Sequence, residues 1–249
     1  MDSLTIAAAS GMRALMDTLN MSANNLANSS TNGFKSDKES YNLYVSPDAQ
    51  AAADGEGYLP TTVPVVQSQW TDFAQGLLVR TGNQLDLALN GKGFFAADGT
   101  SGPLYTRNGS FKLSPQGMLV THEGYPLRTV DKTPIQTQST TPLTVTPEGE
   151  VLQDGQSLGT LEVVDFPDTH VLAKQGNNYF KVTDPSAKPV PAPETQVEQG
   201  KVESSNSSSA NAAVRLVSVM RQFEMLQKAV SISGDMNKHA VEEVARVSS

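Results

Sequence analysis

Residues 4–35, which read LTIAAASGMRALMDTLNMSANNLANSSTNGFK, decide the fold of this chain. Apolar residues recur there at the three- and four-residue spacing of an amphipathic helix, and the pattern stops at Asn32-Gly33, where a left-handed glycine can end a helix. The members of this stripe are Ala8, Met12, Leu15, Leu19 and Leu26. A helix with one apolar face needs a partner, and no similar face follows nearby in the sequence.

A second amphipathic stretch lies at the opposite end of the chain, in residues 211–247. Its apolar residues keep an alternating three and four spacing, which is typical of the seam of a coiled coil. The members of this seam are Leu216, Val219, Phe223, Leu226 and Val230. We expect long terminal helices whose stripes pair with each other, with other subunits, or with both. Packing of the two ends within one compact domain is the alternative.

The end of the first helix is rich in asparagine, which competes for local backbone hydrogen bonds and so weakens a helix. Asn24, Asn25 and Asn28 either bond to neighbouring subunits or only stop the helix, and both interpretations stay open. The residues expected at a subunit interface are Met12, Leu15, Leu19, Asn24, Asn25, Leu26, Asn28, Leu216, Val219, Phe223, Leu226 and Val230.

Residues 36–71 show no sustained period, which predicts an extended linker. The prolines that interrupt the pattern are Pro47, Pro60 and Pro64. Trp70 and Phe73 are expected to anchor the linker on the next domain, because a lone Trp is more often buried than displayed.

The interval between the linker and the last helix has the pattern of an all-β module. Short alternating apolar runs, such as Leu85, Leu87 and Leu89, are separated by turn dipeptides such as Asn90-Gly91. The expected fold class is α+β, with long N- and C-terminal helices pairing as a coiled-coil-like layer and a central all-β module. The expected divisions are a helix at 1–35, a linker at 36–71, an all-β domain at 72–202, and a Ser-rich lead-in with the last helix at 203–249.

Composition excludes several classes of function. The formal net charge is −8 and the sequence pI is about 4.9, which opposes binding to nucleic acid because phosphate backbones need clustered Lys and Arg. The chain has no cysteine, which excludes thiolate metal sites and Cys nucleophiles. No apolar run approaches the roughly 18 residues of a membrane span, and Asp2 precedes the first basic residue, Arg13. We therefore expect neither membrane insertion nor a cleavable signal peptide.

The sequence favours no catalytic, cofactor or metal site. Residues 91–96, GKGFFA, match a dinucleotide-binding pattern, but Gly99 and Pro103 oppose the helix that must open at such a loop. A hairpin turn followed by a Phe-rich strand is expected instead. The histidines share no ligand spacing with acidic residues. They are His122, His170 and His239.

Residues 22–35, SANNLANSSTNGFK, resemble the N-terminal signature of bacterial flagellar rod and hook proteins. Further blocks agree with this family in the same order. They are LDLALNGKGFF at 85–95, YTRNGSF at 105–111 with GMLVT at 117–121, and GKVESSN at 200–206. The last helix, with RQFEM at 221–225, is more similar to the proximal-rod members than to the distal-rod members, which come next.

The resemblance implies a structural subunit without enzymatic activity. Such a subunit is exported unfolded and without cleavage by the flagellar type III apparatus, assembles helically through its terminal helices, and transmits torque in the rod that crosses the periplasm. The implied partners are other copies of the chain, other rod subunits and the export apparatus, and no cofactor is implied. A subunit of another helical assembly, such as a phage tail, is the alternative.

Overall fold

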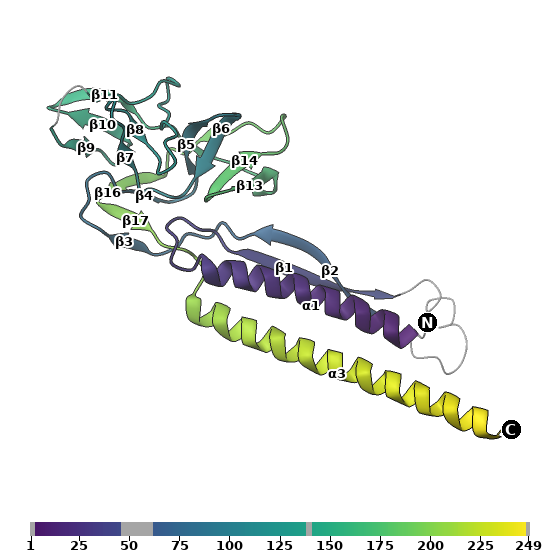
Figure 1. Cartoon of the computed structure of the whole chain (residues 1–249). Coiled ribbons are helices and arrows are strands. Elements are labelled where there is room, and N and C mark those ends of the chain that lie inside the picture. Colours follow the sequence, from purple (N-terminus) through teal and green to yellow (C-terminus); the bar gives the residue numbers. More distant parts are fainter. Residues whose placement is uncertain (1–2, 46–61, 138–140, 248–249) are drawn as a thin grey trace. The chain divides into compact units, whose positions relative to one another are not determined.

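Figure 1 shows the chain in a computed structural model, which describes residues 3–45, 62–137 and 141–247. The chain forms two compact units. Unit 1 comprises residues 1–27, 37–71 and 209–249, and unit 2 comprises residues 28–36 and 72–208. Each unit is therefore built from segments that are far apart in the sequence.

Unit 1 combines two helices with one strand pair. Its elements are α1 (Ser3–Ala27), β1 (Asp37–Val45), β2 (Thr62–Thr71) and α3 (Ser209–Val247). The strands pair antiparallel, from Asp37 opposite Thr71 to Val45 opposite Thr62, with a bulge between Ser40 and Tyr41. Figure 1 shows α1 beside α3 and the strand pair along α1.

The segment expected as an extended linker therefore contributes two strands to unit 1. Pro64 lies inside β2, opposite Leu43. In a two-stranded sheet every strand has a free edge, so a residue without an N–H group is tolerated there. Pro47 and Pro60 lie outside the described residues. Trp70 is 38% exposed in β2, so the expectation of a buried Trp anchor was wrong.

The predicted fold class was also wrong. Among the described residues there are seventeen strands in several sheets and two α-helices, one of 25 residues and one of 39, with no coiled-coil layer. A coiled coil needs large apolar side chains from both helices at the seam. The buried face of α1 instead carries Gly11, Ala14 and Thr18, and the α3 surface near it includes Arg215, Ser218 and Gln222.

Unit 2 contains β3 to β17. The strands are β3 (Leu78–Arg80), β4 (Leu87–Asn90), β5 (Phe94–Gly99), β6 (Gly102–Thr106), β7 (Lys112–Leu113), β8 (Leu119–Val120), β9 (Leu143–Val145), β10 (Glu150–Gln153), β11 (Gln156–Thr160), β12 (Val163–Asp165), β13 (Leu172–Gly176), β14 (Tyr179–Val182), β15 (Val190–Pro191), β16 (Gln196–Gln199) and β17 (Lys201–Glu203). A short 3-10 helix spans Thr169–Val171. The largest sheet has the order β13-β14-β6-β5-β12-β15, and a smaller sheet has the order β11-β10-β9. The remaining pairs are β16-β4, β17-β3 and β7-β8.

Strand β5 separates two hydrophobic cores. Successive side chains of a strand point to opposite faces. Phe95 packs with Leu87, Leu127 and other aliphatic residues in one core, whereas Phe94 packs with Phe180 in an aromatic core. The Phe-rich strand expected after residues 91–93 is thus confirmed, and its two adjacent Phe residues serve both cores. The hairpin expected there was wrong, because β4 pairs with β16 whereas β5 pairs with β6 and β12.

Phe73 confirms its expected role as an anchor in unit 2. Its ring lies 5.5 Å from the ring of Phe94 and 5.1 Å from the ring of Phe180, in edge-to-face arrangements that favour aromatic pairs. The chain is thereby attached to the aromatic core immediately after β2.

Replacing Leu127 by Ala should lower the free energy of unfolding of unit 2 by about 2–5 kcal/mol, because this fully buried side chain leaves a cavity in the aliphatic core. Hydrogen exchange of unit 2 amides in urea measures this loss. The control is Leu113→Ala, whose side chain is 40% exposed and should cost under about 1 kcal/mol. Equal losses in the two variants would contradict the assigned core.

Candidate functional site

The buried face of α1 differs from the apolar stripe seen in its sequence. Residues buried on α1 are Gly11, Ala14, Thr18, Met21 and Ser22. At about 100° per residue, the stripe of Met12, Leu15 and Leu19 lies roughly a quarter turn away around the helix axis. These three side chains stay half-buried. Most of the residues that pack within unit 1 from α1 are therefore small, with Met21 as a large exception, and the large residues of the predicted stripe remain partly open to solvent.

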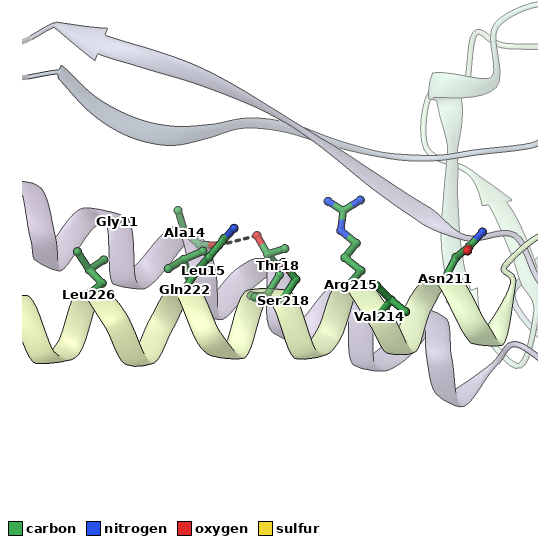
Figure 2. Close-up of a pocket in the computed structure, with 11 residues that line it drawn as sticks. Gly11, Ala14, Leu15, Thr18, Asn211, Val214, Arg215, Ser218, Gln222 and Leu226 are labelled. Atoms are coloured by element: carbon green, nitrogen blue, oxygen red, sulfur yellow. Dashed lines mark hydrogen bonds between the residues drawn. The ribbon is translucent and has the colours of Figure 1, made fainter.

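A groove of about 690 Å³ lies between α1 and α3. Its lining includes Leu15, Val219 and Leu226, so the structure brings together three of the predicted interface residues. Figure 2 labels Leu15 and Leu226 among the lining residues. A Cβ atom placed on Gly11 would lie 3.2 Å from Leu226 Cδ2, which shows how closely the helices approach at this point. Larger side chains on α1 would close the groove.

A buried carboxylate connects three elements of unit 1. The Glu39 side chain on β1 is fully buried. Its Oε1 lies 2.6 Å from Arg215 Nη2 on α3, and its Oε2 accepts a hydrogen bond of 3.1 Å from Thr18 Oγ1 on α1. Thr18 Oγ1 also donates to the Ala14 carbonyl oxygen at 2.9 Å, shown dashed in Figure 2. Sequence reasoning missed this cluster, because its members are far apart in the chain.

The other predicted interface residues lie at several levels of exposure. Half-buried positions are Leu26 on α1 and Leu216, Phe223 and Val230 on α3. Val219 is buried at 6% exposure, and Asn24 is exposed.

Two of the asparagines act within the chain. Asn25 Nδ2 donates to the Asp37 carbonyl oxygen at 2.8 Å, and Asn25 Oδ1 accepts from the Asp37 N–H at 3.0 Å. Asn28 accepts from Thr31 through both its carbonyl and its side-chain oxygen, at 3.1 and 3.3 Å. Asn25 thus joins α1 to the start of β1, and Asn28 forms the turn that follows α1.

Helix α3 carries a second apolar face that lies away from the predicted seam. At about 100° per residue, this face points to nearly the opposite side of the helix. Its members are Val214, Val217, Met225, Ile232 and Met236, which are 72, 48, 65, 50 and 67% exposed, and Val214 at its edge also lines the groove toward α1. An apolar face of this size on a long helix is typical of a protein interaction surface.

A buried charge cluster in unit 2 joins the blocks that carried the family resemblance. Glu203 is fully buried, and its Oε1 lies 2.5 Å from Lys35 Nζ while its Oε2 lies 3.1 Å from Arg107 Nη1. Arg107 Nη2 donates to the Gly91 carbonyl oxygen at 2.8 Å. Burial lowers the pKa of both Lys35 and Arg107, and the nearby Glu203 carboxylate acts in the opposite direction.

These charged residues were quoted within their blocks but received no role from sequence reasoning. The available signal was the single Lys, Arg and Glu at residues 35, 107 and 203, each placed inside an otherwise polar or apolar block. Periodicity cannot find the buried cluster, because its members come from separate elements.

The described ranges offer no cluster of His, Asp and Glu that could hold a metal ion. No helix within those ranges is long and apolar enough to cross a membrane. The chain combines a helical unit that exposes apolar faces and a β-rich unit that has its own cores, and this combination defines a structural assembly subunit.

Known proteins show which assembly this is. Residues 88–153 match the family described as "Flagellar hook protein FlgE/F/G D1 domain", and residues 198–242 match "Flagellar basal body rod FlgEFG protein C-terminal". The chain is 31% identical over 249 residues to flagellar basal-body rod protein FlgF of Caulobacter vibrioides. The alignment covers 99% of this chain and 100% of the relative.

Further relatives agree. The chain is 30% identical over 227 residues to FlgF of Rhizobium meliloti, with 87% of each protein covered. It is 31% identical over 252 residues to flagellar basal-body rod protein FlgG of Agrobacterium fabrum, with 92% of this chain and 94% of the relative covered. The chain belongs to the flagellar basal-body rod protein family and is a structural subunit of the flagellar basal body. The expected likeness to proximal-rod and distal-rod members is confirmed.

Replacing Arg215 by Met should destabilise unit 1 by roughly 1 kcal/mol, because the buried Glu39 carboxylate loses its cation while the exposed half of the Arg side chain limits the effect. Thermal unfolding of the helices, followed by circular dichroism, measures the change. The control is Arg221→Met on the same helix, where the side chain is exposed and little change is expected. A larger effect from Arg221 would contradict the assigned cluster.

Proposed function

We propose that this subunit assembles helically with other copies and with other rod subunits through the helical surface of unit 1. The observation that supports the proposal most strongly is the second apolar face of α3. A helix that is apolar on two sides is normally covered on both. Within the chain, α1 and the seam of α3 account for only one of these sides.

The geometry of such a contact favours a filament. The α3 outer face and the half-buried stripe of α1 are different surfaces, so a contact between them in two copies is heterologous. A heterologous contact that does not close into a ring generates an open helical assembly. This is the arrangement that a rod requires.

The predicted interface residues divide into two groups under this proposal. Met12, Leu15, Leu19 and Leu26, together with Leu216, Phe223, Leu226 and Val230, offer partly exposed apolar area for a neighbouring subunit. Asn24 offers a polar group at the surface. Val219, Asn25 and Asn28 support the interface from within the chain, since each is buried or bonded to its own backbone neighbours.

We further propose that the assembled rod crosses the periplasm and transmits torque, and that the chain has no enzymatic activity. Export would use the flagellar type III apparatus, with the chain unfolded and without cleavage of a signal peptide. The family membership supports this route. The net charge of −8 supports protein partners rather than nucleic acid.

Replacing Met225 by Asp should stop self-assembly and leave the isolated chain folded, because this side chain is 65% exposed in the monomer and would place a charge in the proposed contact. Sedimentation of the purified chain measures assembly. In cells that lack the wild-type copy, the variant should give non-motile bacteria without complete basal bodies by electron microscopy.

The matched control is Gln227→Asp, which adds the same charge two residues away at an exposed position outside the apolar face. It should retain assembly and motility. If Met225→Asp assembles as well as the wild type, the outer face of α3 is not a subunit interface and the proposal fails.

The dilute monomer should lose its ends to protease faster than the segment at residues 72–206, because helices gain little stability without full packing. Mass spectrometry of a limited digest identifies the surviving fragment. Assembly should slow cleavage within α3 at least several-fold. Monomer ends that resist digestion as well as unit 2 would show that the helices need no partner.

A further inference from the structure

We propose that residues 196–206 form a latch that closes unit 2 last in folding. This latch segment contains β16, β17 and the turn that follows them. It pairs with the first strands of unit 2 and also holds two segments that join unit 2 to the rest of the chain, residues 33–36 and 72–76. Without the latch, these parts of unit 2 lose the buried carboxylate of Glu203 and several of their backbone hydrogen-bond partners.

The latch is connected to β3 and β4 by strand pairing. β16 pairs with β4, from Gln196 opposite Asn90 to Gln199 opposite Leu87, and β17 pairs with β3. Each pair is a separate two-stranded sheet. The first three residues of β4 are buried, so their backbone groups need partners within the protein, and the latch strand β16 pairs with them along one edge.

The latch also contacts several other segments of unit 2. Val197 is 3% exposed in the aliphatic core, and its N–H donates to the Pro147 carbonyl oxygen at 2.8 Å. The Gln199 side chain donates to the carbonyl oxygens of Gln84 and Leu143, both at 2.8 Å. The latch therefore connects the start of unit 2 with β9 and the turn after it.

The latch supplies the negative charge of the buried cluster formed by Lys35, Arg107 and Glu203. Lys35 and Arg107 are 1% and 4% exposed, and Glu203 is the carboxylate between them. Two neighbouring buried cations without an anion carry a large desolvation cost. Residues 33–36 thus have a stable place in unit 2 only when Glu203 is present.

Backbone groups around this cluster also form hydrogen bonds with the latch. The Gly33 N–H donates to the Glu203 carbonyl oxygen at 2.7 Å, and the Gly76 N–H donates to Glu203 Oε1 at 2.8 Å. Asn206 Oδ1 accepts from the Ser36 N–H at 2.8 Å, and Asn206 Nδ2 donates to the Asp72 carbonyl oxygen at 2.7 Å. Two residues of the latch therefore hold both joining segments.

Sequence separation decides the order of closure. Lys35 and Glu203 are 168 positions apart, whereas hairpins such as β5–β6 and β10–β11 join adjacent strands. Contacts between distant residues form after local ones, because closing a long loop costs more entropy. In a chain delivered from its N-terminus, unit 2 would stay incomplete until Asn206 emerged. This last consequence rests on the export route proposed above, but the latch itself does not.

Native-state hydrogen exchange on the dilute full-length chain tests the latch. The amides of Gly33, Ser36 and Gly76 should exchange together through an opening that leaves the amides of Leu119 and Leu127 protected. Glu203→Gln should speed exchange at the first three amides by about tenfold or more, because a hydrogen bond to a charged group is lost and two cations stay buried. The two core amides should change less than about threefold.

The matched control is Glu194→Gln, which makes the same change at an exposed position just before the latch and should leave all five amides unaffected. If Glu203→Gln fails to fold, Asn206→Ala gives the test, because it removes only the hydrogen bonds to the two joining segments. It should also speed exchange at Ser36.

Exchange of the joining segments and the core at one common rate in the wild type would overturn the latch, and so would an equal effect of Glu203→Gln on all amides. Both results concern the isolated chain. They are therefore distinct from failure of the assembly proposal, which the Met225→Asp variant tests in the filament and in cells.

Discussion

The structure of unit 2 depends on one buried carboxylate. Glu203 lies between Lys35 and Arg107 without exposure to solvent, and these two side chains balance its charge. An ion in this position is stable only when both partners and the surrounding hydrogen bonds are in place. Segments that contain residues 35, 107 and 203 are consequently required to fold as one unit.

Unit 1 follows a different rule. Its helices approach through small residues such as Gly11 and Ala14, and a buried Glu39 fixes β1 to both helices. Small residues permit close approach and leave the larger apolar side chains for other contacts. The half-buried stripe of α1 and the outer face of α3 are the surfaces that this arrangement makes available, which agrees with membership of a family of structural rod proteins.

Sequence patterns predicted local features well, but they predicted poorly which elements pack against each other. The strand after Gly93 and the anchoring of Phe73 follow from side-chain alternation and aromatic burial, which are local properties. The coiled-coil layer and the buried Trp70 were wrong, because periodicity shows that a helix has an apolar face but not which surface covers it. Pro64 interrupts the pattern of residues 36–71, which predicted a linker, but it lies inside β2. A strand tolerates proline when one of its edges is free, and the sequence alone does not show which edges are free.

Composition, hydrophobic periodicity and residue order were enough to predict amphipathic ends, a β-rich middle and the motif blocks of flagellar rod proteins. Only the tertiary structure decided that Asn25 joins α1 to β1, that the stripe of α1 lies beside its packing face, and that residues 35, 107 and 203 meet. For the charge cluster the physical reason is distance along the chain, because Glu203 lies 168 positions from Lys35 and 96 from Arg107 and their contact depends on how the whole chain folds. Asn25 and Asp37 are only 12 positions apart, but hydrophobic periodicity does not report which polar groups bond to each other.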